Sequence, residues 1–76
     1  MDVMSNAVLP EWLFQKYSQL GQETWDMMKA AIVETFPDAA NFRQETTRHE
    51  RLLNSDYEVV MDFPVVEMTY IATVED

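Results

Sequence analysis

The feature that most constrains the fold is a two-residue alternation of apolar side chains that changes phase at Pro64. The odd-numbered residues of 57–63 are all apolar, whereas after Pro64 the even-numbered residues are. A period of two is typical of strands with one buried face. A turn at Pro64 and Val65 would join the two segments as a hairpin, in which one register makes every inward pair apolar. These pairs are Phe63 with Val66, Met61 with Met68, Val59 with Tyr70, and Tyr57 with Ala72.

Residues 10–36 instead carry apolar side chains at helical spacing. They form two successive stripes, Leu13, Tyr17 and Leu20, and then Trp25, Met28, Ile32 and Phe36. Gly21 lies between the stripes and in phase with both, so we predict two helices broken near Gly21, with one continuous helix as the alternative. Pro37 ends the segment because its ring cannot continue a helix.

Residues 42–53 fit two structures. As a helix they have Asn41 as a cap and Gln44 three residues later. As a strand they supply the third member that a marginal two-stranded hairpin needs. We favour the strand, with Asn54 and Ser55 as the turn and Arg51 opposite Glu58. The predicted fold class is α+β: one or two N-terminal helices (about 10–36) packed on a small antiparallel sheet (about 43–53, 57–63 and 66–74), in a single small domain of residues 1–76.

Composition limits how this domain is stabilised. The 76 residues are 47% apolar with nine aromatic residues, too many for a disordered acidic tail. A core this small barely offsets the conformational entropy that folding removes. The chain has no cysteine for a disulfide and no cluster of His and Cys for a structural zinc. Tight packing or a partner subunit must therefore add stability.

The charge restricts the partners. Fourteen acidic and five basic residues give a net charge of −9, which disfavours direct binding to nucleic acid or to an anionic membrane. The segment MDVMSNAVL has no basic region of the kind that begins a secretory signal, and the apolar runs are too short to cross a bilayer. We expect a cytoplasmic protein with no direct nucleic-acid or membrane partner.

The sequence offers few candidates for a catalytic residue. His49 is the single histidine and lies in the segment TTRHER, without a cysteine anywhere to act as a nucleophile. A metal site of His49 with Glu45 or Glu50 lacks both a ligand count and a known spacing. One glycine cannot build a phosphate-binding loop. We expect a protein that is not an enzyme and has no catalytic residue, metal or cofactor.

Acidic side chains concentrate after residue 53, where there are six acids and no base. In the predicted hairpin four of them share the outward face, Glu58, Asp62, Glu67 and Glu75. Asp62 lies directly opposite Glu67, which costs roughly 0.2–1 kcal/mol. A basic partner would neutralise this face, although a merely solvated face is the alternative. The predicted partner-binding residues are Glu58, Asp62, Glu67, Glu75 and Asp76. Mimicry of nucleic acid is a further hypothesis, but Glu58 and Asp62 lie roughly 13 Å apart along a strand, whereas phosphates of one DNA strand are about 3.4 Å apart.

Two other groups complete the candidates. Met27, Ala30 and Ala31 point away from the second helical stripe and form a candidate oligomer face for a homodimer or another partner. The alternative is that they cover the other helix within the monomer. Arg43, Arg48 and Arg51 form the one basic cluster, for which we predict pairing within the chain with the acidic sheet.

In size, acidity and aromatic content the chain is similar to small phage or plasmid proteins that block host defence enzymes, and to acidic immunity proteins or antitoxins. We predict a non-enzymatic inhibitor or modulator that occludes the basic surface of a nucleic-acid-handling protein, such as a nuclease or a CRISPR complex, in the manner of anti-CRISPR or anti-restriction proteins. If phage-encoded, it would act in the cytoplasm of the host cell. The alternatives are a small oligomeric accessory subunit of a larger assembly, or an immunity or antitoxin protein.

Overall fold

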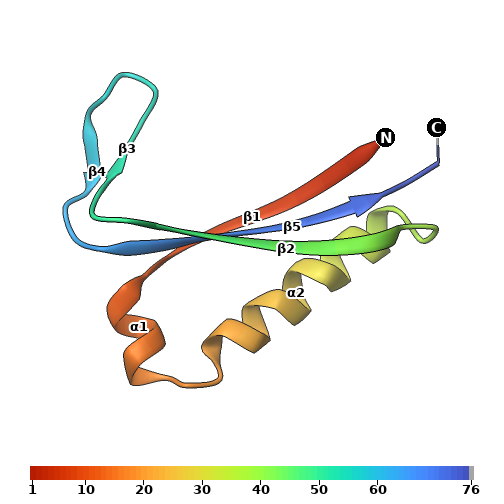
Figure 1. Cartoon of the computed structure of the whole chain (residues 1–76), viewed down its shortest axis with the longest axis horizontal. Coiled ribbons are helices and arrows are strands. Elements are labelled where there is room, and N and C mark those ends of the chain that lie inside the picture. Colours follow the sequence, from red (N-terminus) through yellow and green to blue (C-terminus); the bar gives the residue numbers. More distant parts are fainter. Residues whose placement is uncertain (76) are drawn as a thin grey trace.

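The computed structural model describes residues 1–75 and contains two helices and five strands. Three strands form one antiparallel sheet in the order β1-β5-β2, and the two short strands β3 and β4 form a separate hairpin (Figure 1). In chain order the elements are β1 (Asp2–Pro10), α1 (Glu11–Lys16), α2 (Leu20–Thr35), β2 (Ala40–His49), β3 (Leu52–Leu53), β4 (Val59–Met61) and β5 (Val65–Thr73).

The core lies between α2 and one face of the three-stranded sheet. Met28 and Ile32 of α2 are buried against the central strand β5. Tyr70 of β5 receives two aromatic rings edge-on, from Trp25 at 5.6 Å and from Phe42 at 5.7 Å between ring centroids. The buried residues on this face are Met68, Tyr70 and Ala72 of β5, and Val74 directly after it. The even-numbered apolar set after Pro64 is therefore the buried face, as predicted.

The α+β fold class is confirmed, with two helices on a small antiparallel sheet. The helices are separated at residues 17–19, just before Gly21 rather than at it. A Cβ atom on Gly21 would lie 3.5 Å from the ring of Phe14, which is an ordinary van der Waals contact, so the packing of α1 on α2 does not require glycine at this position. Tyr17 does not continue the first apolar stripe, because it lies in the link and is exposed.

The predicted hairpin of 57–63 with 66–74 is wrong. Strand β5 pairs with β1 on one side and with β2 on the other, so Val66 lies opposite Leu9 and Arg48. Residues 2–10, which the sequence analysis did not assign to a strand, supply a nine-residue partner. Two long partners give the central strand more backbone hydrogen bonds than one hairpin partner could.

The strand prediction for 42–53 is confirmed, but its register is different. Leu52 lies opposite Met61, and Leu53 lies opposite Val59, with an irregularity between them. Arg51 is therefore not opposite Glu58. The turn is longer than the predicted two residues, because the backbone N–H of Asn54 donates to the carbonyl of Glu58 at 2.9 Å.

The second face of the sheet carries no helix among the described residues, and we call it the open face (Figure 1). The register places Glu67, Thr69 and Ile71 of β5 on it. Across the neighbouring strands the same face includes Met4, Asn6 and Val8 of β1 and Arg43, Glu45 and Thr47 of β2. Within residues 1–75, no helix is both long and apolar enough to span a membrane.

Candidate functional site

The hairpin of β3 and β4 projects from the end of the sheet, on the side opposite α2 (Figure 1). We call residues 50–63 the arm. Along the chain the arm connects β2 to β5. These two strands pair directly, with His49 opposite Val65, so the arm is a long loop between paired neighbours. Its two strands form only two residue pairs, and an isolated two-stranded hairpin contributes little stability of its own.

Asn54 organises the tip of the arm. Its side-chain oxygen accepts hydrogen bonds from the backbone N–H groups of Asp56 at 2.9 Å and Glu58 at 3.0 Å. Its backbone carbonyl accepts a third, from Tyr57 at 3.0 Å. Asparagine commonly closes turns in this way. One side chain therefore fixes the tip in a defined conformation.

Tyr57 occupies an unusual position in this tip. Its φ angle is 62°, in the left-handed region that favours glycine and asparagine over bulky residues. Its side chain is 84% exposed, the highest value among the large hydrophobic residues described. The residue thus gains no packing that would offset its backbone conformation, so the fold alone gives no reason for tyrosine here.

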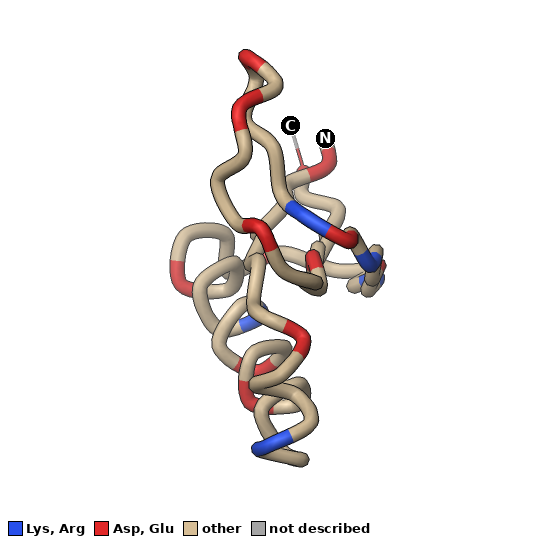
Figure 2. Tube along the Cα trace, turned by 90° about the vertical axis from the view of Figure 1, so that its left-hand side faces the viewer, with Lys and Arg blue, Asp and Glu red and all other residues tan. Residues whose placement is uncertain are grey.

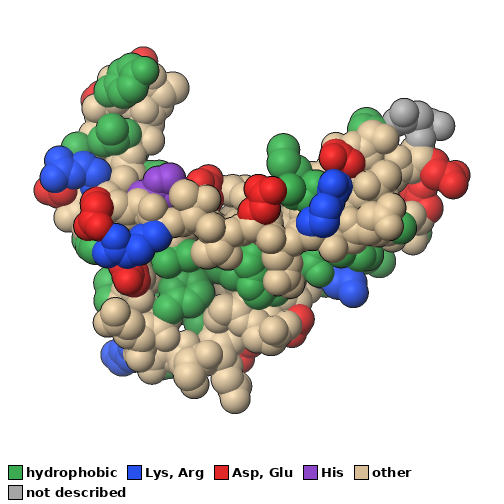
Figure 3. Space-filling view, in the orientation of Figure 1, with side chains coloured by type: hydrophobic (Ala, Val, Ile, Leu, Met, Phe, Trp, Pro, Cys, Tyr) green, Lys and Arg blue, Asp and Glu red, His purple; other side chains and the backbone are tan. Residues whose placement is uncertain are grey.

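The arm also displays aliphatic and aromatic side chains to solvent (Figure 3). Val60 is 56% exposed, and the exposed set also includes Leu53, Val59 and Phe63. Scattered exposed apolar residues are ordinary, but here several lie together on one projecting hairpin. Aromatic residues such as Tyr57 are enriched among the residues that dominate binding energy at protein interfaces.

Acidic residues surround this apolar group. Asp56 and Glu58 are both exposed at the tip, and Figure 2 shows acidic positions near the top of the arm. Neither takes part in the ion pairs found among residues 1–75. Asp62, lower on the arm, lies 3.7 Å from Arg51. The tip is therefore apolar at Tyr57 with uncompensated negative charge on both sides.

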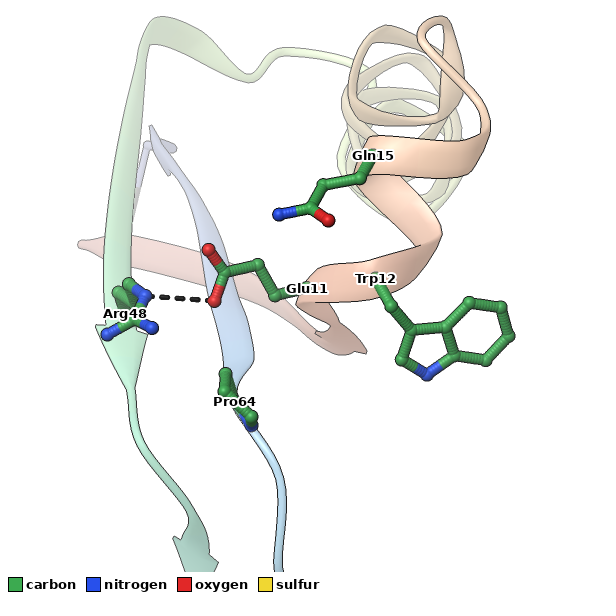
Figure 4. Close-up of a pocket in the computed structure, with 5 residues that line it drawn as sticks. All are labelled: Glu11, Trp12, Gln15, Arg48 and Pro64. Carbon is green, nitrogen blue, oxygen red and sulfur yellow. Dashed lines mark hydrogen bonds and ion pairs between the residues drawn. The ribbon is translucent and has the colours of Figure 1, made fainter.

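The base of the arm is held by α1 and β2. The backbone N–H of Glu11 donates to the carbonyl of Pro64 at 3.0 Å, and the Glu11 carboxylate accepts from Arg48 at 2.9 Å (Figure 4). Arg48 also pairs with Glu50, and the hydrogen bonds to Glu50 and Glu11 raise the pKa of Arg48. Its charge is thus neutralised within the chain. These contacts fix the direction in which the arm leaves the sheet.

A pocket of about 290 Å³ lies at this base, lined by Glu11, Trp12, Gln15, Arg48 and Pro64. Trp12 is 55% exposed, and its ring points away from the Glu11–Arg48 pair (Figure 4). The pocket holds one carboxylate already paired with its arginine. It offers an exposed aromatic side chain beside the arm rather than an acid, base or nucleophile.

The open face carries a small hydrogen-bonded cluster around Glu67. The His49 ring nitrogen Nε2 lies 3.1 Å from one carboxylate oxygen, and the side-chain amide of Asn6 donates to the other at 3.2 Å. Asn6 also donates to the hydroxyl of Thr69 at 2.9 Å. These hydrogen bonds, that from His49 first, lower the pKa of Glu67 below its ordinary value of 4.5.

The lowered pKa of Glu67 predicts a pH-dependent contribution to stability. The charged carboxylate stabilises the fold above its unfolded-state pKa, and this contribution is lost as the pH falls through the lower folded-state pKa. We expect Glu67→Gln to reduce the free energy of unfolding at pH 7 by less than about 1 kcal/mol, because the pair is partly solvated. Urea denaturation at pH 7, 5 and 3 should show the difference from wild type shrinking with acidity. A difference that stayed constant with pH would contradict this prediction.

The predicted acidic residues do not form one hairpin face. Glu58 and Asp62 lie on the arm, and Glu67 lies on the open face, where it faces His49 instead of Asp62. The backbone N–H of Glu75, after β5, donates to Asp38 at 3.3 Å. Asp76 lies outside the described residues. The arm and the open face border a hollow side of the molecule (Figure 3).

The other predicted groups are placed as follows. Met27 is 73% exposed on α2, and Ala30 and Ala31 are exposed as well. The three arginines pair within the chain: Arg43 with Asp2 at 3.2 Å, Arg48 with Glu11 and Glu50, and Arg51 with Asp62. Of these partners only Asp62 belongs to the acidic segment after residue 53 that the prediction named. In the described part of the chain, no three His, Asp or Glu side chains gather closely enough to hold a metal ion.

Sequence reasoning missed Tyr57 as a functional candidate because the alternation assigned it to the buried face. The signal that could have found it is Asn54, which lies three residues before Tyr57 and is of a type that favours turns. Comparisons of the chain with protein-family models, with curated proteins and with solved structures found no match.

Proposed function

We propose that this protein is a non-enzymatic inhibitor that binds a basic protein partner through its arm. The observation that carries the proposal is Tyr57, which is 84% exposed in a left-handed backbone conformation at the tip of a projecting hairpin. A tyrosine that neither packs nor suits its backbone conformation is accounted for if it is an anchor that a partner buries.

The charges around the anchor support a basic partner. Asp56 and Glu58 flank Tyr57 without a neutralising base in the chain, and the whole protein carries a charge of −9. Such a field accelerates association with a positively charged surface and repels nucleic acid and other acidic proteins. Enzymes that handle nucleic acid present basic surfaces of this kind. We therefore propose a nuclease or CRISPR-type complex of the cytoplasm as the partner, occluded where it would bind nucleic acid.

The test is affinity capture from an extract of the native host at low and high salt, read by mass spectrometry. The informative variant is Tyr57→Gly, because glycine tolerates the φ of 62° and the fold is preserved. We expect it to weaken capture of the partner at least about tenfold. The matched control is Tyr17→Ala, which removes another exposed tyrosine far from the arm.

Charge and apolar contact have separable signatures in this experiment. Glu58→Lys should slow association and reduce its dependence on salt, because it removes steering rather than the anchor. A basic protein retained by wild type and by Tyr17→Ala, but lost with Tyr57→Gly, supports the proposal. The proposal would be overturned if wild type, Tyr17→Ala and Tyr57→Gly captured identical proteins, or if capture by wild type did not weaken with salt.

A further inference from the structure

The three-stranded sheet has two free edges, and they differ in protection. Strand β2 carries charged residues along its length and an irregular register between Ala40 and Arg43. Charges and bulges are the usual devices that prevent an edge from pairing with another strand. Strand β1, with the sequence DVMSNAVLP, has one charged residue, Asp2, and a regular register throughout. Its edge is unprotected until Pro10.

The backbone groups that β1 offers can be identified. Met1 and Val74 exchange hydrogen bonds of 3.1 and 2.8 Å, which makes them a hydrogen-bonded pair of the β1–β5 ladder. Such pairs alternate along an antiparallel ladder. The even-numbered residues Asp2, Met4, Asn6 and Val8 therefore direct their N–H and C=O groups away from β5, toward the free edge.

An apolar groove runs beside this edge, between β1 and α2. It has a volume of about 460 Å³ and no charged residue in its lining, which consists of Ser5, Ala7, Leu9, Leu20, Thr24, Met27 and Met28. Met27 is 73% exposed in it, and the exposed Ala31 follows one turn later on the same helix. An unpaired strand edge and an uncovered apolar groove thus lie side by side.

We propose that a second copy of this chain occupies this surface, with the two β1 strands paired antiparallel about a two-fold axis at Ser5. The two sheets then form one continuous six-stranded sheet, and the two α2 helices lie side by side over the axis. Such an interface uses the same residues from both copies, as a two-fold dimer requires. Met27 of each copy is covered by the groove of the other.

The position of the axis follows from the edge groups. With the axis at Ser5, Asp2 pairs with Val8 of the second copy and Met4 pairs with Asn6, so all four outward-facing residues are used. Moving the axis by one residue in either direction leaves one of the four without a partner. This register also keeps the two Asp2 carboxylates apart.

Two properties of the chain favour a second copy over a different occupant. A chain with a charge of −9 repels itself, so two copies can approach only where charge is low, and the β1 edge with its uncharged groove is such a surface. The small core, with seven buried hydrophobic residues, also leaves a domain of this size short of stability unless apolar surface is covered by association.

The first test is disulfide cross-linking, for which single cysteines can be introduced because the chain has none. Ser5→Cys places two cysteines opposite each other at the axis, in a non-hydrogen-bonded pair whose Cα atoms lie about 4.5 Å apart, within the range for a disulfide. Gln44→Cys is the matched control, because Gln44 and Ser5 both lie opposite Tyr70, on the two different edges. On mild oxidation we expect a disulfide-linked dimer for Ser5→Cys and mainly monomer for Gln44→Cys.

The second test removes one backbone N–H group from the free edge of β1. Met4→Pro deletes an outward N–H without breaking a hydrogen bond to β5, and proline is accepted on edge strands in this orientation. Because dimer formation rises with concentration, we expect wild type at about 100 µM to sediment as a dimer and Met4→Pro as a monomer. A wild-type monomer at this concentration overturns the proposal, as does equal cross-linking of the two cysteine variants. If Met4→Pro does not fold, the cysteine pair decides. Tyr57→Gly leaves this interface intact, so the dimer and the proposed function fail separately.

Discussion

Replacing residues 51–63 by Asn-Gly is expected to abolish partner binding and leave the fold intact. The arm leaves the sheet where His49 and Val65 already lie opposite each other in the β2–β5 ladder. Glu50, Asn, Gly and Pro64 then form a four-residue loop between these two strands, a length that commonly connects antiparallel strands. The contacts at the base survive, because Glu11 keeps both the Pro64 carbonyl and Arg48.

The expected stability of this shortened chain follows from burial. None of the seven buried hydrophobic residues of the described chain lies in the arm. The shortened chain also has eleven fewer residues to order, so we expect the free energy of unfolding to stay within about 1 kcal/mol of wild type. Thermal unfolding by circular dichroism measures this, and affinity capture measures binding. A shortened chain that is unfolded would show that the arm is structural, and one that still captures the partner would exclude the arm as the binding site.

The largest effect on stability is expected from Met68→Ala. Met68 is 2% exposed at the centre of β5 and belongs to the core cluster with Met28 and Ile32 of α2. Truncating a buried methionine removes its transfer energy and leaves a cavity, which costs about 2–5 kcal/mol. For a domain of this size that is a large part of the total stability, so we expect a fall in Tm of about 10 °C or more.

The control for Met68→Ala is Val33→Ala, which shortens an exposed side chain on the outer side of α2. We expect it to change the free energy of unfolding by no more than about 0.5 kcal/mol. Urea denaturation of both variants gives the comparison. Similar small losses for the two would mean that α2 does not pack on β5 as described, and would contradict the core assignment.

Much of the local structure could be read from the sequence. The helical stripe of Met28 and Ile32 and the two-residue period of Met68, Tyr70 and Ala72 identified the two faces that form the core. Helix α2 ends at Thr35, with Phe36 as its C-cap directly before Pro37, as expected from the restrictions that proline imposes. These features depend on spacing along the chain, which each segment carries by itself.

Two parts of the structure could not be predicted in this way. Residues 2–10 carry polar Ser5 and Asn6 together and apolar Ala7, Val8 and Leu9 together, so neither period is clear. Residues 57–63 alternate well, yet Tyr57, Val59 and Phe63 are exposed on the arm. The prediction joined 57–63 to β5 because the two are adjacent in sequence, whereas the fold joins β5 to β1 from the other end of the chain.

The sequence by itself determined the α+β class and the buried faces of α2 and β5. Only the tertiary structure decided which strands flank β5, and hence which apolar residues remain exposed. The physical reason is that a two-residue period shows that a strand has a face to bury but not which segment will pair with its edges, because strand pairing is a competition among all segments of the chain. Strands β1 and β2 took both edges of β5, and residues 50–63 became a projecting arm with Tyr57 at its tip.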